Sequence, residues 1–204
     1  LSNALWSCAV LEHKPPAHWL GQWENAFSQR RMRAATPHDL ASALWACGSL
    51  RRRPSKPWLE LFETTTRNRL HEFNAHDLSN VIHGFGRLRQ LPSEAWLARF
   101  TAATEPLLEK RLTRRESGAQ GTHEGGNSSR GDRSAMAPPL RGRRSHATFT
   151  PQGLMCVIWA MSIIGHKPQS DWFQRWASSF EASIDSASPQ ELSISLHACA
   201  SLGR

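Results

Sequence analysis

Flat aromatic rings recur at one position of a repeated segment of this chain. They are Trp6, Trp45, His83, Trp159 and His197. Indole and imidazole rings can stack on nucleobases, and one such contact contributes on the order of 1–3 kcal/mol. Large rings in repeat proteins also pack against the neighbouring repeat, and we favour packing over stacking for these five. The pattern therefore predicts a row of rings at the boundary of a binding face.

Two further positions of the same segment vary along the chain and are often polar. Position 3 reads Asn3, Ser42, Asn80, Cys156 and Ile194, and position 10 reads Val10, Ser49, Arg87, Ile163 and Ser201. Helical-repeat proteins that read RNA address one base per repeat through two or three side chains from stacked helices. Surface positions can also drift without any role, and that alternative stays open. The base-facing candidates are Asn3, Trp6, Ser42, Trp45, Asn80, His83, Arg87, Trp159 and His197.

Basic residues follow every copy of the segment. The candidates for contact with phosphate are Lys14, Arg51, Arg52, Arg53, Arg89 and Lys167. One cationic cluster per repeat, always at the same edge, would form a ridge able to follow a phosphate backbone. Cations are also favoured at helix C-termini by the helix dipole, so a structural role is compatible with the same pattern.

The overall charge supports a polyanionic partner. The chain has 25 Lys and Arg against 17 Asp and Glu, a net charge of +8 and a pI near 10.3. Nucleic acid is the first candidate partner, and an anionic membrane surface is the second. No apolar run reaches the roughly 18–20 residues that a membrane span requires.

The sequence carries no pattern typical of an enzyme. Its ten histidines are scattered over separate repeat positions, without an HExxH motif, a nucleophile elbow or a glycine-rich phosphate loop. The four cysteines form no CxxC pair, and three of them share one apolar column of the repeat. We therefore expect no catalytic residue, no metal, no cofactor and no small-molecule substrate.

A periodic array of helices must position these side chains. Trp19, Trp58, Trp96 and Trp172 lie 39, 38 and 76 residues apart, and 76 is twice 38. Self-similarity at such a period marks a solenoid, in which each repeat buries its apolar face against its neighbours. The repeated segment begins at Leu1, Leu40, Leu78, Leu154 and Leu192, which we number position 1.

This segment is predicted to be a helix, called helix A. Positions 1, 4, 5, 8 and 11 are almost wholly apolar, which is helical spacing. Thr36 and Ser188 each supply a hydroxyl cap that is followed by proline and then by an acid. On a helical wheel positions 1, 5 and 8 face the core, so positions 3, 6 and 10 are expected on the opposite, solvent-facing side.

A second helix, helix B, is predicted after a proline-bearing turn. In the second copy its apolar stripe includes Trp58, Phe62, Thr66 and Leu70, at spacings of four. Each repeat is therefore a pair of antiparallel helices. The predicted fold is an all-α solenoid of about four helical hairpins plus one extra helix A.

One segment interrupts the period and divides the chain into three parts. Residues 113–148 contain seven arginines, three acids and no Trp, Phe, Ile or Val. A segment that buries no apolar area cannot offset its ordering entropy, so we expect a disordered basic loop. The predicted domains are repeats over 1–112, the insert over 113–148 and repeats over 149–204, with the first and last repeats truncated.

The turns resemble those of a known repeat family. KPPAHWL (14–20), RPSKPWL (53–59), LPSEAWL (91–97) and KPQSDWF (167–173) resemble the Pro-Pro-Pro-Glu-Trp signature of octotricopeptide repeats. PHDLASALWACGSL (37–50) and PQELSISLHACASL (189–202) match helix A of that family. No copy keeps the full turn signature: residues 16–19, for example, lack the acid. The resemblance covers all of the chain except the insert.

The resemblance implies an organellar RNA-binding protein of the green-algal type. Such a protein would bind single-stranded RNA sequence-specifically and govern maturation, stability or translation of a transcript, in the chloroplast more than in the mitochondrion. Other RNA-processing proteins are possible partners. Some relatives carry a C-terminal RAP domain, and none is visible here. Two alternatives stay open: a protein–protein scaffold built from the same solenoid, and RNA binding by the insert alone.

Overall fold

The computed structural model describes residues 1–118 and 148–204, and these residues form an all-α array. No strand occurs among them, so the predicted fold class is confirmed. The helices are α1 (Ser2–Val10), α2 (Ala17–Ala26), α3 (Gln29–Ala34), α4 (Pro37–Ser49), α5 (Lys56–Arg67), α6 (Ala75–Leu88), α7 (Glu94–Gly118), α8 (Pro151–Ile164), α9 (Ser170–Glu181) and α10 (Pro189–Leu202). Short 3-10 turns at Leu70–Glu72 and Ile184–Ser186 follow α5 and α9.

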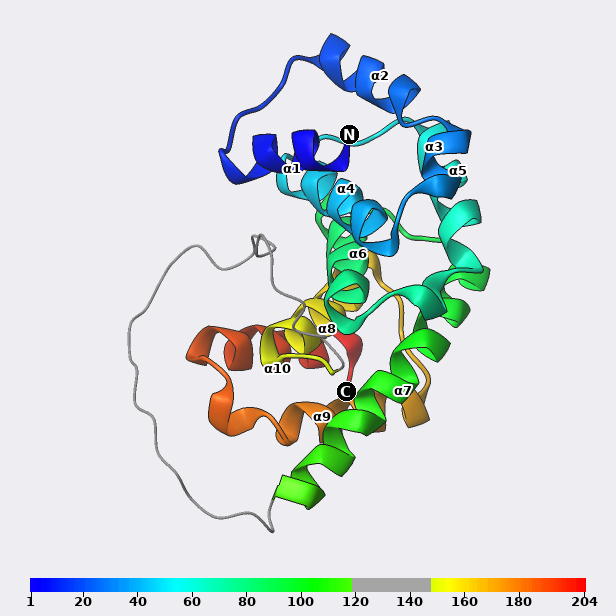
Figure 1. The fold of residues 1–204 in the computed structure, drawn as a ribbon. Helices are drawn as coiled ribbons and strands as arrows, with labels where there is room; N and C mark the ends of the chain where they lie inside the picture. Colours follow the sequence, from blue (N-terminus) through cyan, green and yellow to red (C-terminus); the bar gives the residue numbers. More distant parts are fainter. Residues whose placement is uncertain (119–147) are drawn as a thin grey trace.

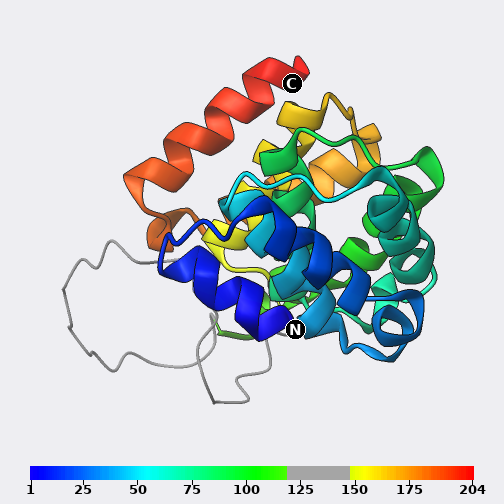
Figure 2. The same cartoon turned by 90° about the horizontal axis from the view of Figure 1, so that it is seen from above.

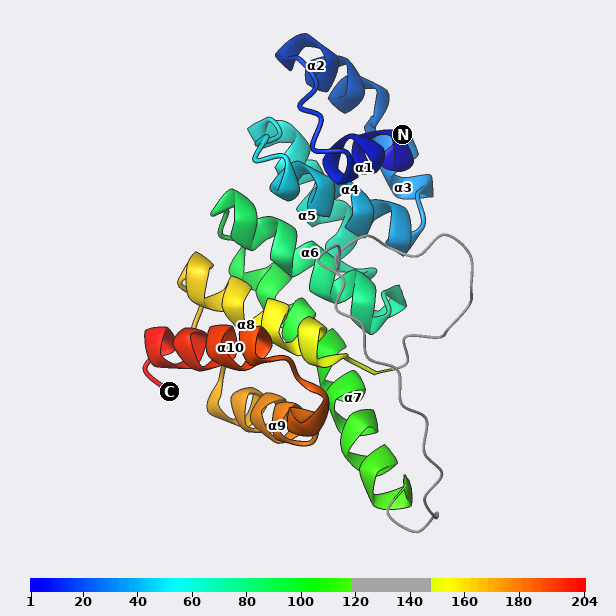
Figure 3. The ribbon, with the colours of Figure 1, turned by 90° about the vertical axis from the view of Figure 1, so that its left-hand side faces the viewer.

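The helices form two layers. Helices α1, α4, α6, α8 and α10 are the predicted helices A and stack on one another, and α3, α5, α7 and α9 contact one another in the helix-B layer (Figures 1 and 3). The two termini lie at opposite ends of the stack. Seen from above, α1 and α10 run in different directions, so the stack twists along its length (Figure 2).

Helix A begins where its caps predict. The Thr36 hydroxyl accepts from the Asp39 amide at 3.2 Å, and the Asp39 carboxylate accepts from the Thr36 amide at 3.3 Å. Ser188 and Glu191 form the same reciprocal pair at the start of α10. These bonds satisfy amide groups that a helix N-terminus would otherwise leave without partners.

Helix A ends at a left-handed residue in every copy. This residue is position 12 of the repeat, and the five copies are Glu12 (φ 53°), Arg51 (φ 52°), Arg89 (φ 49°), Gly165 (φ 73°) and Gly203 (φ 71°). Glycine adopts this conformation freely, whereas another residue there costs on the order of 1 kcal/mol. The first three repeats therefore place charged side chains on strained backbone where the last two use glycine.

The tryptophans of helix B anchor the repeats, as predicted. Trp58, Trp96 and Trp172 are buried, while Trp19 in the first repeat is half-buried. The Trp96 indole N–H donates to the Thr66 hydroxyl of the preceding helix B at 2.9 Å. Trp172 donates in the same way to Thr104, at 2.8 Å, across the insert. The insert therefore leaves the register of the array unchanged.

Small residues let the helices A approach closely. A Cβ atom added at Gly84 of α6 would lie 2.8 Å from the Leu44 carbonyl oxygen of α4. A Cβ atom at Gly48 of α4 would lie 3.0 Å from the Arg87 Cβ atom. Only glycine permits backbones to meet at this distance, and the close approach brings the ends of α4 and α6 together.

Helix α7 runs to Gly118 and so enters the range 113–148 that was predicted as the insert. The predicted disorder of the remainder concerns residues 119–147, which lie outside the described residues. Within the described residues, no helix is long and apolar enough to span a membrane.

Candidate nucleic-acid interface

Fewer side chains at positions 3 and 6 of helix A are exposed to solvent than the helical wheel suggests. Ser42 and Asn80 at position 3 are each 3% exposed, and Trp45 at position 6 is 6% exposed. The prediction that position 3 faces solvent is wrong for Ser42 and Asn80, whereas the burial of Trp45 agrees with the packing favoured for position 6. Each inner helix A is flanked by two other helices A and backed by helix B, so three sides are buried. Asn3, in the first helix of the stack, is exposed.

Two of the rings at position 6, His83 and Trp159, contact each other. Trp6, His83 and Trp159 are half-buried, whereas His197 on α10 is exposed. The His83 and Trp159 rings lie 5.2 Å apart between centroids, at 35°, across the junction of α6 and α8. This geometry is the inter-repeat packing that the sequence favoured, and it leaves part of the Trp159 ring open.

Burial changes the protonation of His83, one of the rings at position 6. Burial, together with the charge on Arg87, lowers the pKa of His83 to about 4. The imidazole is therefore neutral at physiological pH and offers an aromatic surface rather than a cation.

Within the described residues, the Trp6 and Trp45 indole nitrogens and the Ser42 hydroxyl are buried without a hydrogen-bond partner.

Four arginines converge at the edge of the helix-A layer. Arg51 and Arg53 follow α4, and Arg87 and Arg89 end α6. Together they line a cavity of 340 Å³, which is within the size range of small-ligand sites. Among its described lining residues none is acidic; the others are Gly86, Leu88, Trp159 and Ile163. Such a concentration of positive charge favours an anion.

The cavity combines residues that the sequence had assigned to different roles. Arg51, Arg53 and Arg89 were predicted to contact phosphate, whereas Arg87 and Trp159 were predicted to face bases. The other phosphate candidates lie elsewhere: Arg52 is half-buried beside the cavity, and Lys14 and Lys167 are exposed in the α1–α2 and α8–α9 turns. The basic turns thus follow one edge of the stack, with one concentrated site.

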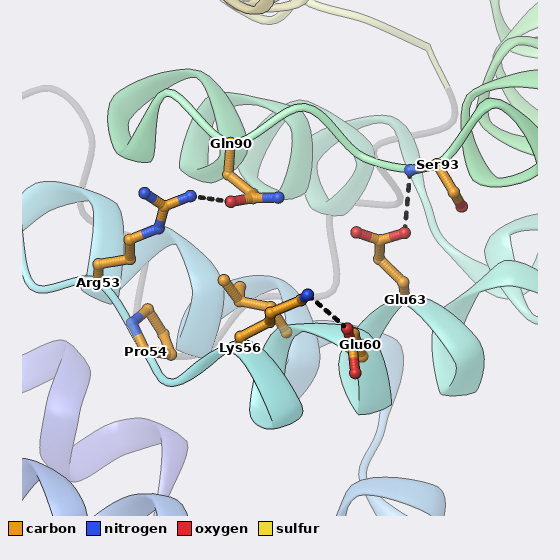
Figure 4. A pocket seen from close by; sticks show the side chains of 8 residues that line it. Arg53, Pro54, Lys56, Glu60, Glu63, Gln90 and Ser93 are labelled. Carbon is orange, nitrogen blue, oxygen red and sulfur yellow. Dashed lines mark hydrogen bonds and ion pairs between the residues drawn. The ribbon is translucent and has the colours of Figure 1, made fainter.

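A larger neighbouring cavity has mixed charge. It has a volume of 620 Å³ and lies between the α4–α5 and α6–α7 turns (Figure 4). The Glu63 carboxylate accepts from the Ser93 amide at 3.0 Å, and Lys56 lies 3.7 Å from Glu60. The Arg53 guanidinium donates to the Gln90 side chain on its rim. Two carboxylates make this cavity a poor site for an anion.

A third cavity lies between helices B. It has a volume of 400 Å³ and is lined by Arg67, Arg99 and His71, together with small and apolar residues. It carries fewer cations than the cavity beside Trp159, and no tryptophan or phenylalanine is among its described lining residues. We therefore centre the candidate interface on the arginine-lined cavity.

Gly86 is a residue of this cavity that the sequence analysis missed. A Cβ atom at Gly86 would lie 3.0 Å from the Cζ3 atom of the Trp159 ring. The absent side chain therefore lets the indole sit against the α6 backbone. The signal was visible, because position 9 of the repeat is small in every copy: Ala9, Gly48, Gly86, Ser162 and Ala200.

These features define a class of protein: an array of α-helical hairpins whose helix-A edge carries a cationic cavity beside an aromatic ring. Residues 1–120 match the family described as Tbc2 translation factor, N-terminal domain. The match spans more than half of the 204 residues, so the chain belongs to this family. No curated protein is similar enough to count as a relative. Membership connects the chain with organellar translation or a related RNA function.

Proposed function

We propose that the chain binds single-stranded RNA sequence-specifically along the edge of its helix-A layer and acts without catalysis. The hairpins would serve as octotricopeptide-like repeats in chloroplast RNA maturation, stability or translation. The observation that carries the proposal is the arginine-lined cavity beside Trp159, in which phosphate and base contacts are available together. Basic turns along the same edge extend the positive surface in both directions.

The division of roles follows from the burial of the helix-A face. Arg51, Arg87 and Arg89 are exposed and would bind phosphates, which supplies affinity without sequence preference. Sequence preference would come from exposed polar groups such as Asn3 and His197. At one base per repeat the five helices A would read about five nucleotides.

A salt titration tests the proposal. We expect the affinity for a random single-stranded RNA pool to fall linearly with the logarithm of salt concentration, as counterions are released. Replacing Arg51, Arg52 and Arg53 by Ala should make the slope shallower by about 0.7 for each of these arginines that contacts a phosphate, so by about 0.7 for Arg51 alone and by about 2 for all three. Fluorescence anisotropy with end-labelled RNA gives both quantities.

A matched control removes the same charge from the other layer. Arg30, Arg31 and Arg33 lie exposed on α3, on the helix-B side of the array. Their replacement by Ala should leave the slope close to that of the parent chain. Equal effects of the two triple variants would refute a localised interface. If the parent chain binds no RNA pool at low salt, the protein–protein scaffold is the better explanation.

Deletion of the insert tests the remaining alternative. Removing residues 113–148 should leave RNA affinity largely intact if the helices carry the interface. Loss of all binding in a variant that keeps its helical circular dichroism would assign the interface to the insert. Recovery of intact RNA after incubation with the chain is expected, because the proposal includes no catalytic step.

A further inference from the structure

Two arginines with left-handed backbone, at the ends of two successive helices A, lie around the same cavity. Arg51 and Arg89 occupy the same position 12 in successive repeats and both have left-handed backbone, with φ of 52° and 49°. Gly165 and Gly203 fill this position in later repeats, and Glu12 fills it in the first repeat with φ of 53°. A non-glycine residue in this region is destabilising, and such strain clusters at functional sites. Both arginines line the same cavity.

The cavity has two chemically different ends. On one side the guanidinium groups of Arg51, Arg87 and Arg89 have no carboxylate partner among the described residues. On the other side the Trp159 ring is held by His83 at 5.2 Å, and Ile163 lies one helical turn further along α8. An anionic group and a flat ring joined by a short linker would satisfy both ends.

We infer that this cavity binds one nucleotide of the RNA, with its phosphate against Arg51, Arg87 and Arg89 and its base against Trp159. The inference rests on the proposed RNA binding and names the site at which it is strongest. Arginine suits the phosphate, because its planar group donates two parallel hydrogen bonds to phosphate oxygens. The ring suits any base, since stacking is tolerant of sequence.

This combination of side chains occurs at one place in the described part of the array and does not recur in every repeat. In the other described turns, Lys14 in the α1–α2 turn and Lys167 in the α8–α9 turn each follow a helix A that ends at Glu12 or Gly165. Those position-12 residues supply no cation. Within the part of the chain that the structure describes, only the junction of α4, α6 and α8 therefore combines two position-12 arginines with an open tryptophan ring.

Adenosine 5′-monophosphate is a direct probe of the inferred site. It should shift the Trp159 indole N–H resonance in ¹H–¹⁵N spectra of the full chain, with the resonance assigned from the Trp159→Phe variant. Adenosine and inorganic phosphate, each carrying half of the ligand, should bind more weakly than the nucleotide. A nucleotide that leaves the Trp159 resonance unmoved at saturation would overturn the inference.

Replacing a position-12 arginine by glycine distinguishes an effect on nucleotide binding from an effect on stability. Arg51→Gly and Arg89→Gly remove the cation and also relieve the left-handed strain, so thermal stability should stay equal or rise slightly. Each variant should lose about tenfold or more in affinity for the nucleotide, the loss expected for one charge-assisted hydrogen bond. Glu12→Gly makes the same backbone change at the equivalent position outside the cavity. It should leave nucleotide affinity unchanged.

The outcomes distinguish this inference from the broader proposal. If the RNA pool binds Arg51→Gly and the parent chain equally well, RNA binding stands and the nucleotide site is wrong. If the nucleotide binds as described but no RNA pool binds, the site stands and the RNA-binding function is wrong. A loss of affinity in Glu12→Gly equal to that in Arg51→Gly would also contradict the inference, because Glu12 does not line the cavity.

Discussion

The hydrogen bond between neighbouring helices B can be tested by removing one hydroxyl. Thr66→Val keeps the shape of the side chain but leaves the Trp96 indole N–H without an acceptor. Trp96 is fully buried, and its N–H lies 2.9 Å from the Thr66 hydroxyl, so no water replaces the bond. A buried donor left unpaired costs about 1–3 kcal/mol. We therefore expect unfolding free energy to fall by about 2 kcal/mol.

Urea unfolding followed by circular dichroism measures this loss. Thr64→Val on the same helix is the matched control, because Thr64 is exposed and donates only to the Glu60 carbonyl of its own helix, at 2.7 Å. The control should change stability by less than about 0.5 kcal/mol. Thr66→Ser, which keeps the hydroxyl, should lose less than Thr66→Val. Equal losses in Thr66→Val and Thr64→Val would refute the reasoning.

The remaining predictions concern the ring row and the helix-A contacts. Because the pKa of His83 falls from 6.5 to about 4 on folding, stability should decrease as pH drops through this window, by up to about 3 kcal/mol. His83→Phe should flatten that part of a thermal-melting profile recorded against pH; an unchanged profile would contradict a buried neutral imidazole. Gly84→Ala should lower unfolding free energy by about 1–3 kcal/mol, since the new methyl group meets the Leu44 backbone. On α2, a Cβ atom added at Gly21 would have no neighbouring atom within 4 Å, so Gly21→Ala should instead raise the unfolding free energy by up to about 1 kcal/mol. If both substitutions change the unfolding free energy in the same direction, the close approach of α4 and α6 is refuted.

The fold could be predicted from sequence because its signals are local. The capping pairs at Thr36 and Ser188 mark helix starts within four residues, and the recurrence of Trp58, Trp96 and Trp172 shows how hairpins stack. These signals need no knowledge of distant contacts. Every inner repeat also presents the same apolar pattern, so one correct alignment was sufficient for the whole array.

The interface was harder to predict because its composition depends on which residues the stack brings together. A helical wheel assumes one buried side, whereas α4, α6 and α8 each have neighbours on three sides. Ser42 and Asn80 therefore became buried although their positions looked like surface. The cavity combines Arg51 and Trp159, which lie more than a hundred residues apart in sequence and on opposite sides of the insert.

Position 12 connects the fold to the proposed activity. The hairpin turn needs a left-handed residue there, and glycine at Gly165 and Gly203 provides it without strain. Arginine at the same point in two successive repeats costs stability in each and places both side chains around one cavity. Glu12 has the same backbone conformation outside the cavity, so strain alone does not identify the site; the convergence of two such arginines on one cavity does. If the two guanidinium groups hold a ligand at this junction, Arg51→Gly should lose nucleotide affinity while its melting temperature stays equal or rises slightly.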